Sequence, residues 1–149
     1  MGLENWPNLV RHQATIAEIQ QLRAVVDRDL GDAEKGVSPD TQFTLAYNAA
    51  LQLCTIALRA EGYEVARRTL GHHALAINTL SLTLGEPHRE TQVFLSFCST
   101  KRHQAFYDQV GVVTEKDAEE LRRTARQLRE DVIAWLRRRH PDLVPDSPR

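Results

Sequence analysis

The spacing of apolar residues constrains this fold more than any other feature of the sequence. In four long stretches, apolar side chains recur every three or four positions, which is the spacing that lines one face of an α-helix. No segment alternates polar and apolar residues for long enough to predict a β-strand. We therefore expect an all-α protein, built as an antiparallel up-and-down bundle of four long helices plus one short helix.

Local signals place the ends of these helices. We expect long helices over residues 13–33, 38–61, 87–111 and 114–139, and a short one over 72–84. Ser38 followed by Pro39 is a strong helix start, and Gly62 is suited to end the same helix. Thr114 with Asp117 forms an acidic variant of the capping box.

The length of 149 residues fits one domain with a single core. We expect residues 1–149 to form one helical domain, with an ordered bundle over about 13–139. The segments 1–12 and 141–149 are expected to be flexible ends, and residues 63–71 a linker or short helical turn.

Charge and composition narrow the function classes. Lys and Arg number 19 against 20 Asp and Glu, so the chain lacks the positive excess that drives sequence-independent nucleic-acid binding. No secretion signal and no membrane-spanning apolar run is found, so we expect a soluble cytoplasmic protein without a membrane partner. Cys54 and Cys98 fit reduced core thiols, and with no zinc-like spacing or Gly-rich phosphate loop we expect neither a metal nor a cofactor.

The stretch from Glu86 to Gly111 changes character along its length. Its first half reads as a buried helix, because apolar residues fall at helical spacing at Val93, Phe94, Phe97 and Cys98. Its second half is polar, with Lys101, Arg102, His103, Tyr107 and Asp108. Such a helix end suits either a functional site or ordinary solvated surface.

Three segments carry a resemblance to a known family: DTQFTLAYNAALQLCTIALRAEG (40–62), GHHALAINTLSLTLG (71–85) and KRHQAFYDQVGVVTEKDAEEL (101–121). Together with the order of the helices, they resemble the HEPN family of small helical domains (higher eukaryotes and prokaryotes, nucleotide-binding). The resemblance implies a two-fold homodimer formed through the helices that carry the motif. It also implies RNA or nucleotide binding, metal-independent ribonuclease activity, or pairing with a nucleotidyltransferase-type antitoxin.

The ribonuclease motif of that family is an Arg followed, after four to six intervening residues, by a His. Here the matching Arg is Arg102, and the expected His is replaced by Tyr107. The resemblance makes Arg102, His103 and Tyr107 the candidate catalytic residues, with His103 as the substitute proton carrier, because it shares a helix face with Tyr107. Lys101 and Asp108 are candidate binding residues beside them.

A second candidate binding cluster consists of Arg67, Arg68, His72 and His73 around Gly71. The start of a helix preceded by Gly can cradle an anion, but these histidines can equally cap and pack the helix. His12 and His88 look like isolated surface histidines.

Three functions follow from these patterns. The first is a dimeric HEPN-like module that binds RNA or nucleotides in a toxin-antitoxin or stress and defence system. The second is a non-enzymatic protein-protein interaction module, in which Lys101 or Arg102 pairs with an acid of a neighbouring helix. The third is a small-molecule pocket between helices.

Overall fold

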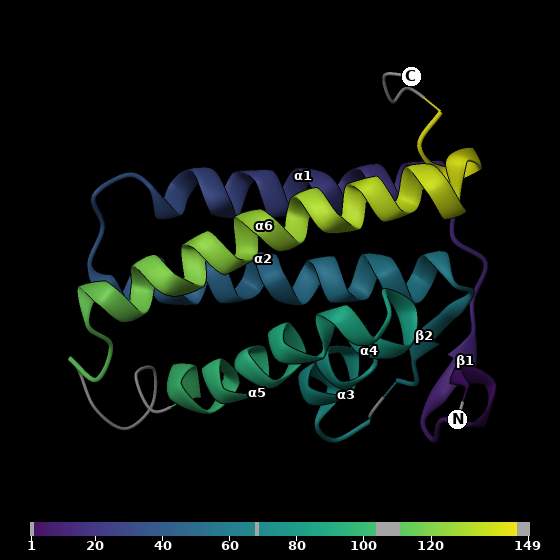
Figure 1. The fold of residues 1–149 in the computed structure, drawn as a ribbon, viewed down its shortest axis with the longest axis horizontal. Helices are drawn as coiled ribbons and strands as arrows, with labels where there is room; N and C mark the ends of the chain where they lie inside the picture. The colour runs from purple at the N-terminus through teal and green to yellow at the C-terminus, as the bar shows by residue number, and fades with distance from the viewer. Residues whose placement is uncertain (1, 68, 104–110, 146–149) are drawn as a thin grey trace.

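The computed structural model describes residues 2–67, 69–103 and 111–145, and this part of the chain is mostly helical (Figure 1). Its α-helices are α1 (Ile16–Ala33), α2 (Pro39–Ala60), α3 (His72–Asn78), α4 (Leu80–Thr83), α5 (Arg89–His103) and α6 (Glu115–Arg139). The strands β1 (Leu9–Arg11) and β2 (Tyr63–Val65) form one antiparallel pair. The all-α class is confirmed for the described residues, with a small sheet added.

Helix α2 is the central element. It packs against α1 and α6 on one side and against α3, α4 and α5 on the other (Figure 1). Its start is confirmed, because the Thr41 N–H donates to Ser38 Oγ and Pro39 occupies the first turn. Gly62 follows its last turn with φ +95°, a left-handed conformation that favours glycine, as the sequence predicted.

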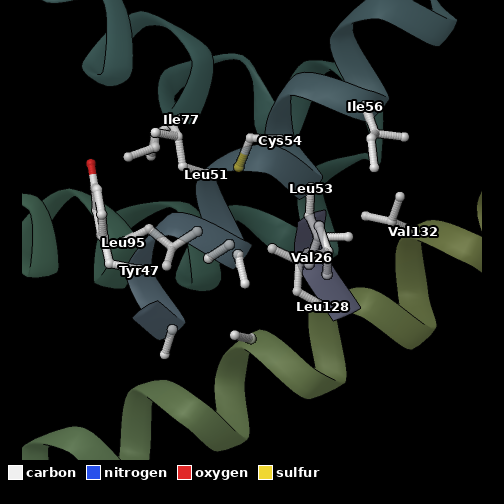
Figure 2. Packing of buried hydrophobic residues seen from close by; sticks show 14 of the residues in the cluster. Val26, Tyr47, Leu51, Leu53, Cys54, Ile56, Ile77, Leu95, Leu128 and Val132 are labelled. Atoms are coloured by element: carbon white, nitrogen blue, oxygen red, sulfur yellow. The ribbon is translucent and has the colours of Figure 1, made fainter. Parts of the chain in front are cut away.

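The core lies on both sides of α2. Leu53 and Ile56 face the apolar residues of α1 and α6, among them Val26, Leu128 and Val132 (Figure 2). On the other side, Tyr47, Leu51 and Cys54 lie toward Ile77 and Leu95 (Figure 2). Several α2 positions that contact neighbouring helices are Ala, and this small residue lets the helices approach closely: Ala46, Ala49, Ala50 and Ala57.

Helix α6 agrees with its sequence signals. Thr114 and Asp117 form the predicted capping box, in which each side chain accepts a hydrogen bond from the backbone of the other. The apolar stripe is buried as expected, at Leu121, Ala125, Leu128, Val132, Trp135 and Leu136.

The N-terminal segment differs from its expectation. Residues 2–12 are not a loose lead-in, because Leu3–Asn5 form a 3-10 turn and β1 pairs with β2, with Leu9 opposite Val65. Residues 63–65 are accordingly a strand and not a linker. Each strand has three residues, too few to show an alternating pattern, and their pairing joins segments far apart in the sequence.

The first helix and the short helix also differ in detail. Helix α1 begins at Ile16 because Thr15 caps it, and the predicted short helix divides at Thr79 into α3 and α4. The Thr79 hydroxyl donates to the Ala76 carbonyl at 2.8 Å, which satisfies a carbonyl at the end of α3.

Helix α5 presents a different face to the core from the one expected. Val93 and Phe97, predicted to be buried, are each 62% exposed, whereas Leu95 is fully buried. Gln92 explains this rotation, because its buried side-chain oxygen accepts a hydrogen bond from the Ser81 backbone N–H at 2.8 Å. Cys98 is buried as predicted.

Among the described residues, no helix combines the length and the apolar character needed to span a bilayer.

Candidate functional site

Lys101, a predicted binding residue, is held by the protein itself. Its ammonium forms an ion pair with Asp117 Oδ2 at 3.0 Å and lies 5.9 Å from the centre of the Phe97 ring. Asp117 also accepts from the Thr114 N–H, and these hydrogen bonds, first from the Thr114 backbone and then from Lys101, lower its pKa. Lys101 therefore fastens the end of α5 to the start of α6.

Arg102, the residue matching the family motif, contacts the core. Its guanidinium lies 5.3 Å from the centre of the Tyr47 ring, and Tyr47 belongs to α2. Burial raises the pKa of Tyr47, while the nearby Ser99 side chain and the charge of Arg102 lower it less strongly. Arg102 thus interacts with a buried tyrosine and retains a partly exposed side chain.

The remaining residues of the first cluster divide into two groups. His103 is exposed at the end of α5. Tyr107 and Asp108 lie outside the described residues.

The second cluster lies close to the first. Helix α3, which begins at His72, packs against α5, and the rings of His72 and His73 are 6.1 Å apart. Partial desolvation lowers the pKa of His73, and the charges of Arg102 and His72 lower it further. Arg67 is exposed and Arg68 lies outside the described residues. The structure therefore brings Arg102 and His73 into electrostatic reach from different helices.

An exposed apolar row precedes this polar end on α5. Val93 and Phe97 are one helical turn apart and both point away from the core. The row continues into Lys101, whose ammonium lies over the Phe97 ring. Exposed apolar side chains next to one another mark a surface suited to association.

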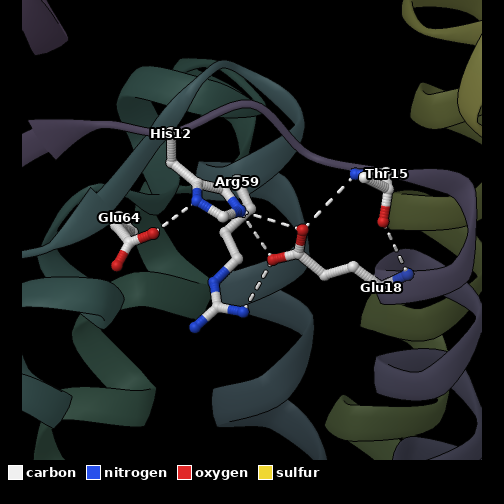
Figure 3. Close-up of polar contacts among 5 residues, drawn as sticks. All are labelled: His12, Thr15, Glu18, Arg59 and Glu64. Carbon is white, nitrogen blue, oxygen red and sulfur yellow. Dashed lines mark hydrogen bonds and ion pairs between the residues drawn. The ribbon is translucent and has the colours of Figure 1, made fainter.

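The structure also forms a polar cluster that the sequence analysis missed. His12 was expected to be isolated, but its Nε2 lies 2.7 Å from Glu18 Oε2, and its Nδ1 contacts a carboxylate oxygen of Glu64 (Figure 3). Arg59 Nη1 donates to the same Glu18 oxygen at 2.8 Å. Burial by itself would raise the pKa of Glu18, but hydrogen bonds from His12, Arg59 and the Thr15 backbone outweigh it and lower the pKa.

The sequence contains a local signal for the Thr15 and Glu18 part of this cluster. Thr15 and Glu18 have the spacing of a capping box, which the structure confirms: the Glu18 N–H donates to Thr15 Oγ1 at 3.1 Å (Figure 3). His88 was also expected to be isolated, and its Nε2 lies 3.3 Å from Asp131 Oδ2. The contacts of His12 with Glu64 and of His88 with Asp131 join residues distant in sequence and carry no local pattern.

An open pocket of about 510 Å³ lies beside His12 and Arg59. Its lining combines two guanidinium groups with small and apolar residues, and it includes Arg11, Ala14, Ala60 and Leu143. Arg59 is already bound to Glu18, and Arg11 lies over the Tyr63 ring at 5.3 Å, so both cations have protein partners.

The structure bears directly on metal binding and on the state of the cysteine thiols. In the described part of the chain, no group of three or more His, Cys, Asp or Glu side chains is placed to hold a metal ion. Both cysteines are buried and free, and burial raises the pKa of each thiol to about 12. At neutral pH both are therefore protonated core residues, as predicted.

Comparisons with known proteins found no matching family model, no matching curated protein and no matching solved structure.

Proposed function

We propose that this chain is a HEPN-like helical-bundle module that pairs as a two-fold dimer through α5 and binds RNA or nucleotide phosphates at the polar end of that helix. The observation that carries the proposal is the exposed Val93 and Phe97 pair, which lies on the same helix as Lys101, Arg102 and His103. The resemblance to the family implies a dimer through this helix, and a surface suited to one lies there.

An antiparallel pairing of two α5 helices is self-complementary. Val93 and Phe97 lie at similar distances on either side of Leu95, so Val93 of one copy would lie opposite Phe97 of the other. Glu90 lies near one end of the helix and Lys101 near the opposite end. The same pairing therefore brings Glu90 of one copy near Lys101 of the other in both halves of the interface.

Basic and imidazole groups near the end of α5 support phosphate binding. His72, His73 and His103 are exposed, and Arg102 is partly exposed. Arg67 is also exposed and precedes α3 in the second candidate cluster. In a dimer, two such clusters would concentrate positive charge that the balanced chain otherwise lacks. Because the pKa of His73 is lowered, a neutral imidazole lies near Arg102 at pH 7, which suits a proton acceptor in RNA cleavage.

The alternative is a non-enzymatic protein-protein interaction module. It is favoured by the Lys101 to Asp117 ion pair and by the contact between Arg102 and Tyr47, because both cations then stabilise the fold. The exposed row on α5 would serve this function equally well. A nucleotidyltransferase-type antitoxin is the partner that the family resemblance suggests.

RNA binding tests the proposal through a matched pair of arginines. Arg67 belongs to the second candidate cluster, before α3, and Arg137 lies near the C-terminal end of α6; both are exposed. We expect Arg67→Ala to weaken binding of fluorescently labelled single-stranded RNA several-fold in an anisotropy titration. We also expect it to reduce the salt dependence by about one counterion, because one phosphate contact is lost.

Arg137→Ala serves as the control and should leave RNA affinity unchanged. The same labelled RNA, incubated with EDTA and resolved on a gel, reports metal-independent cleavage. Equal losses for both variants would show that binding is not localised at this cluster. Complete absence of binding at low salt would contradict the RNA proposal and leave the interaction module.

A further inference from the structure

His12 lies between two carboxylates that come from different elements. Nε2 lies 2.7 and 2.9 Å from the two oxygens of Glu18 in α1, and Nδ1 contacts Glu64 in β2 (Figure 3). Its backbone N–H donates to the Gly62 carbonyl at 2.9 Å. The side chain is 23% exposed, so both contacts are partly shielded from water.

This geometry defines a protonation requirement. An ionised carboxylate only accepts hydrogen bonds, and a neutral imidazole has a single N–H to donate. The hydrogen bonds that lower the pKa of Glu18 keep that carboxylate ionised. Two carboxylates, one at each ring nitrogen, are therefore matched only by the doubly protonated imidazolium.

The other charged groups around the ring do not remove this requirement. Arg59 of α2 donates to Glu18 and so competes for one oxygen of that carboxylate. Arg11 at the end of β1 lies over Tyr63 of β2 and donates to its hydroxyl at 3.4 Å. Both are cations, so neither can accept a hydrogen bond from the imidazole.

The need for a doubly protonated His12 has a structural consequence because of where this residue lies. It follows β1 directly and joins that strand to α1, so residues 2–12 form a strap across one end of the molecule (Figure 1). Leu3 of the strap packs with Leu58 of α2 and Val65 of β2 in a small cluster separate from the main core. Partly buried Leu75 of α3 packs against the same cluster.

We propose that the strap is a proton-dependent closure, docked while His12 is doubly protonated and loosened when one ring nitrogen loses its proton. On deprotonation one carboxylate contact has no hydrogen, and the strap is then held by the β1 to β2 pairing and the Leu3 contacts. Loosening it uncovers Leu58 and Val65, frees the edge of β2, and removes a support from α3. This inference is independent of RNA binding.

Hydrogen exchange at different pH values tests the closure in the full chain. Exchange of peptides covering 9–12 and 62–66 is expressed as protection factors, which remove the intrinsic effect of pH on exchange. Between about pH 6 and about pH 9, a range that brackets ordinary imidazole titration, we expect protection to fall by about tenfold, the size of one lost charge-assisted hydrogen bond. Peptides from α6 serve as the internal reference for global stability.

Three variants separate protonation from packing. We expect His12→Gln to show low strap protection at both pH values, and His12→Lys, which remains a cation at pH 9, to lose most of the pH dependence. His88→Gln removes a histidine paired with a carboxylate elsewhere and should leave the strap unchanged. Equal strap protection in the wild type at both pH values would overturn the proposal, as would His12→Gln protected as well as the wild type at pH 6.

Discussion

At the scale of single residues, the contact between Arg102 and Tyr47 decides whether the motif arginine belongs to a site or to the fold. The guanidinium lies 5.3 Å from the ring centre of a tyrosine that is 1% exposed. Among the described residues, the buried Tyr47 hydroxyl has no hydrogen-bond partner, although the Ser99 side chain is close enough to lower its pKa. A buried hydroxyl in this state contributes little to stability.

We expect Arg102→Ala to lower the free energy of unfolding by about 0.5–2 kcal/mol, the range of a cation-π contact with partial burial. Tyr47→Phe keeps the ring and removes the hydroxyl, so it should leave stability within about 0.5 kcal/mol of wild type or raise it. Urea denaturation of both variants measures these changes. A cost above about 1 kcal/mol for Tyr47→Phe would show that the hydrogen bond to Ser99 forms in solution.

At the scale of elements, the ends of α2 and α6 are joined by a compact charged contact. Glu61, directly after α2, accepts hydrogen bonds from Arg139 at 2.7 and 3.0 Å and contacts His140. Burial raises the pKa of Glu61, but hydrogen bonds from Arg139 and His140 outweigh this and lower it below the ordinary value. The folded state therefore favours the ionised carboxylate.

The sign of the pH effect follows from that lowered pKa. The stability from Glu61 is complete above its unfolded pKa of 4.5 and is lost as pH falls through the lower folded value. We expect Glu61→Gln to cost about 1–2 kcal/mol at pH 7, the scale of lost hydrogen bonds to a charged group, and progressively less toward pH 3. Urea denaturation across this range measures the difference.

Glu119→Gln is the matched control, because this α6 carboxylate is 63% exposed and its ion pair with Arg123 spans 3.7 Å. Its cost should be small at every pH. A constant penalty for Glu61→Gln between pH 7 and pH 3 would contradict the linkage.

The sequence predicted those elements whose signals are local. The caps at Ser38 and Thr114 and the end at Gly62 lie within a few residues of the groups they satisfy, so their spacing is readable. The rotation of α5 was predicted wrongly, because Gln92 and Leu95 are as close to helical spacing as Val93 and Phe97 are. The buried face is marked by the hydrogen bond from the Ser81 N–H to Gln92, which joins α4 to α5 and has no local sequence pattern.

The candidate site could also be predicted only in part, because only some of its residues are neighbours in the sequence. Lys101, Arg102 and His103 are neighbours in the sequence, so their presence at one helix end could be predicted. An acid of a neighbouring helix was expected to pair with Lys101 or Arg102, as Asp117 does with Lys101. Which residues pair could not be predicted, because Asp117 and Tyr47 belong to other helices and the pairing depends on how those helices pack. The contacts of His12 with Glu18 and Glu64 depend in the same way on where β1 lies.

At the scale of the whole molecule, the α6 side and the α5 side differ in the side chains that they expose. Ion pairs join α6 to α1, as between Arg129 and Asp27, and to the residue directly after α1, as between Arg122 and Glu34. Much of the arginine-rich surface of α6 is therefore neutralised within the chain. The α5 side instead exposes Val93 and Phe97. Association is therefore expected on the α5 side.

Sedimentation equilibrium at tens of micromolar protein tests this expectation most directly. We expect the wild type to have twice the chain mass of 16.9 kDa, and Phe97→Asp to have the mass of one chain, because a charge would be buried at the centre of the interface. Leu70→Asp is the matched control, since Leu70 is 97% exposed outside α5, and it should remain a dimer. A wild-type mass of a single chain, or a Phe97→Asp variant that still pairs, would contradict dimerisation through α5.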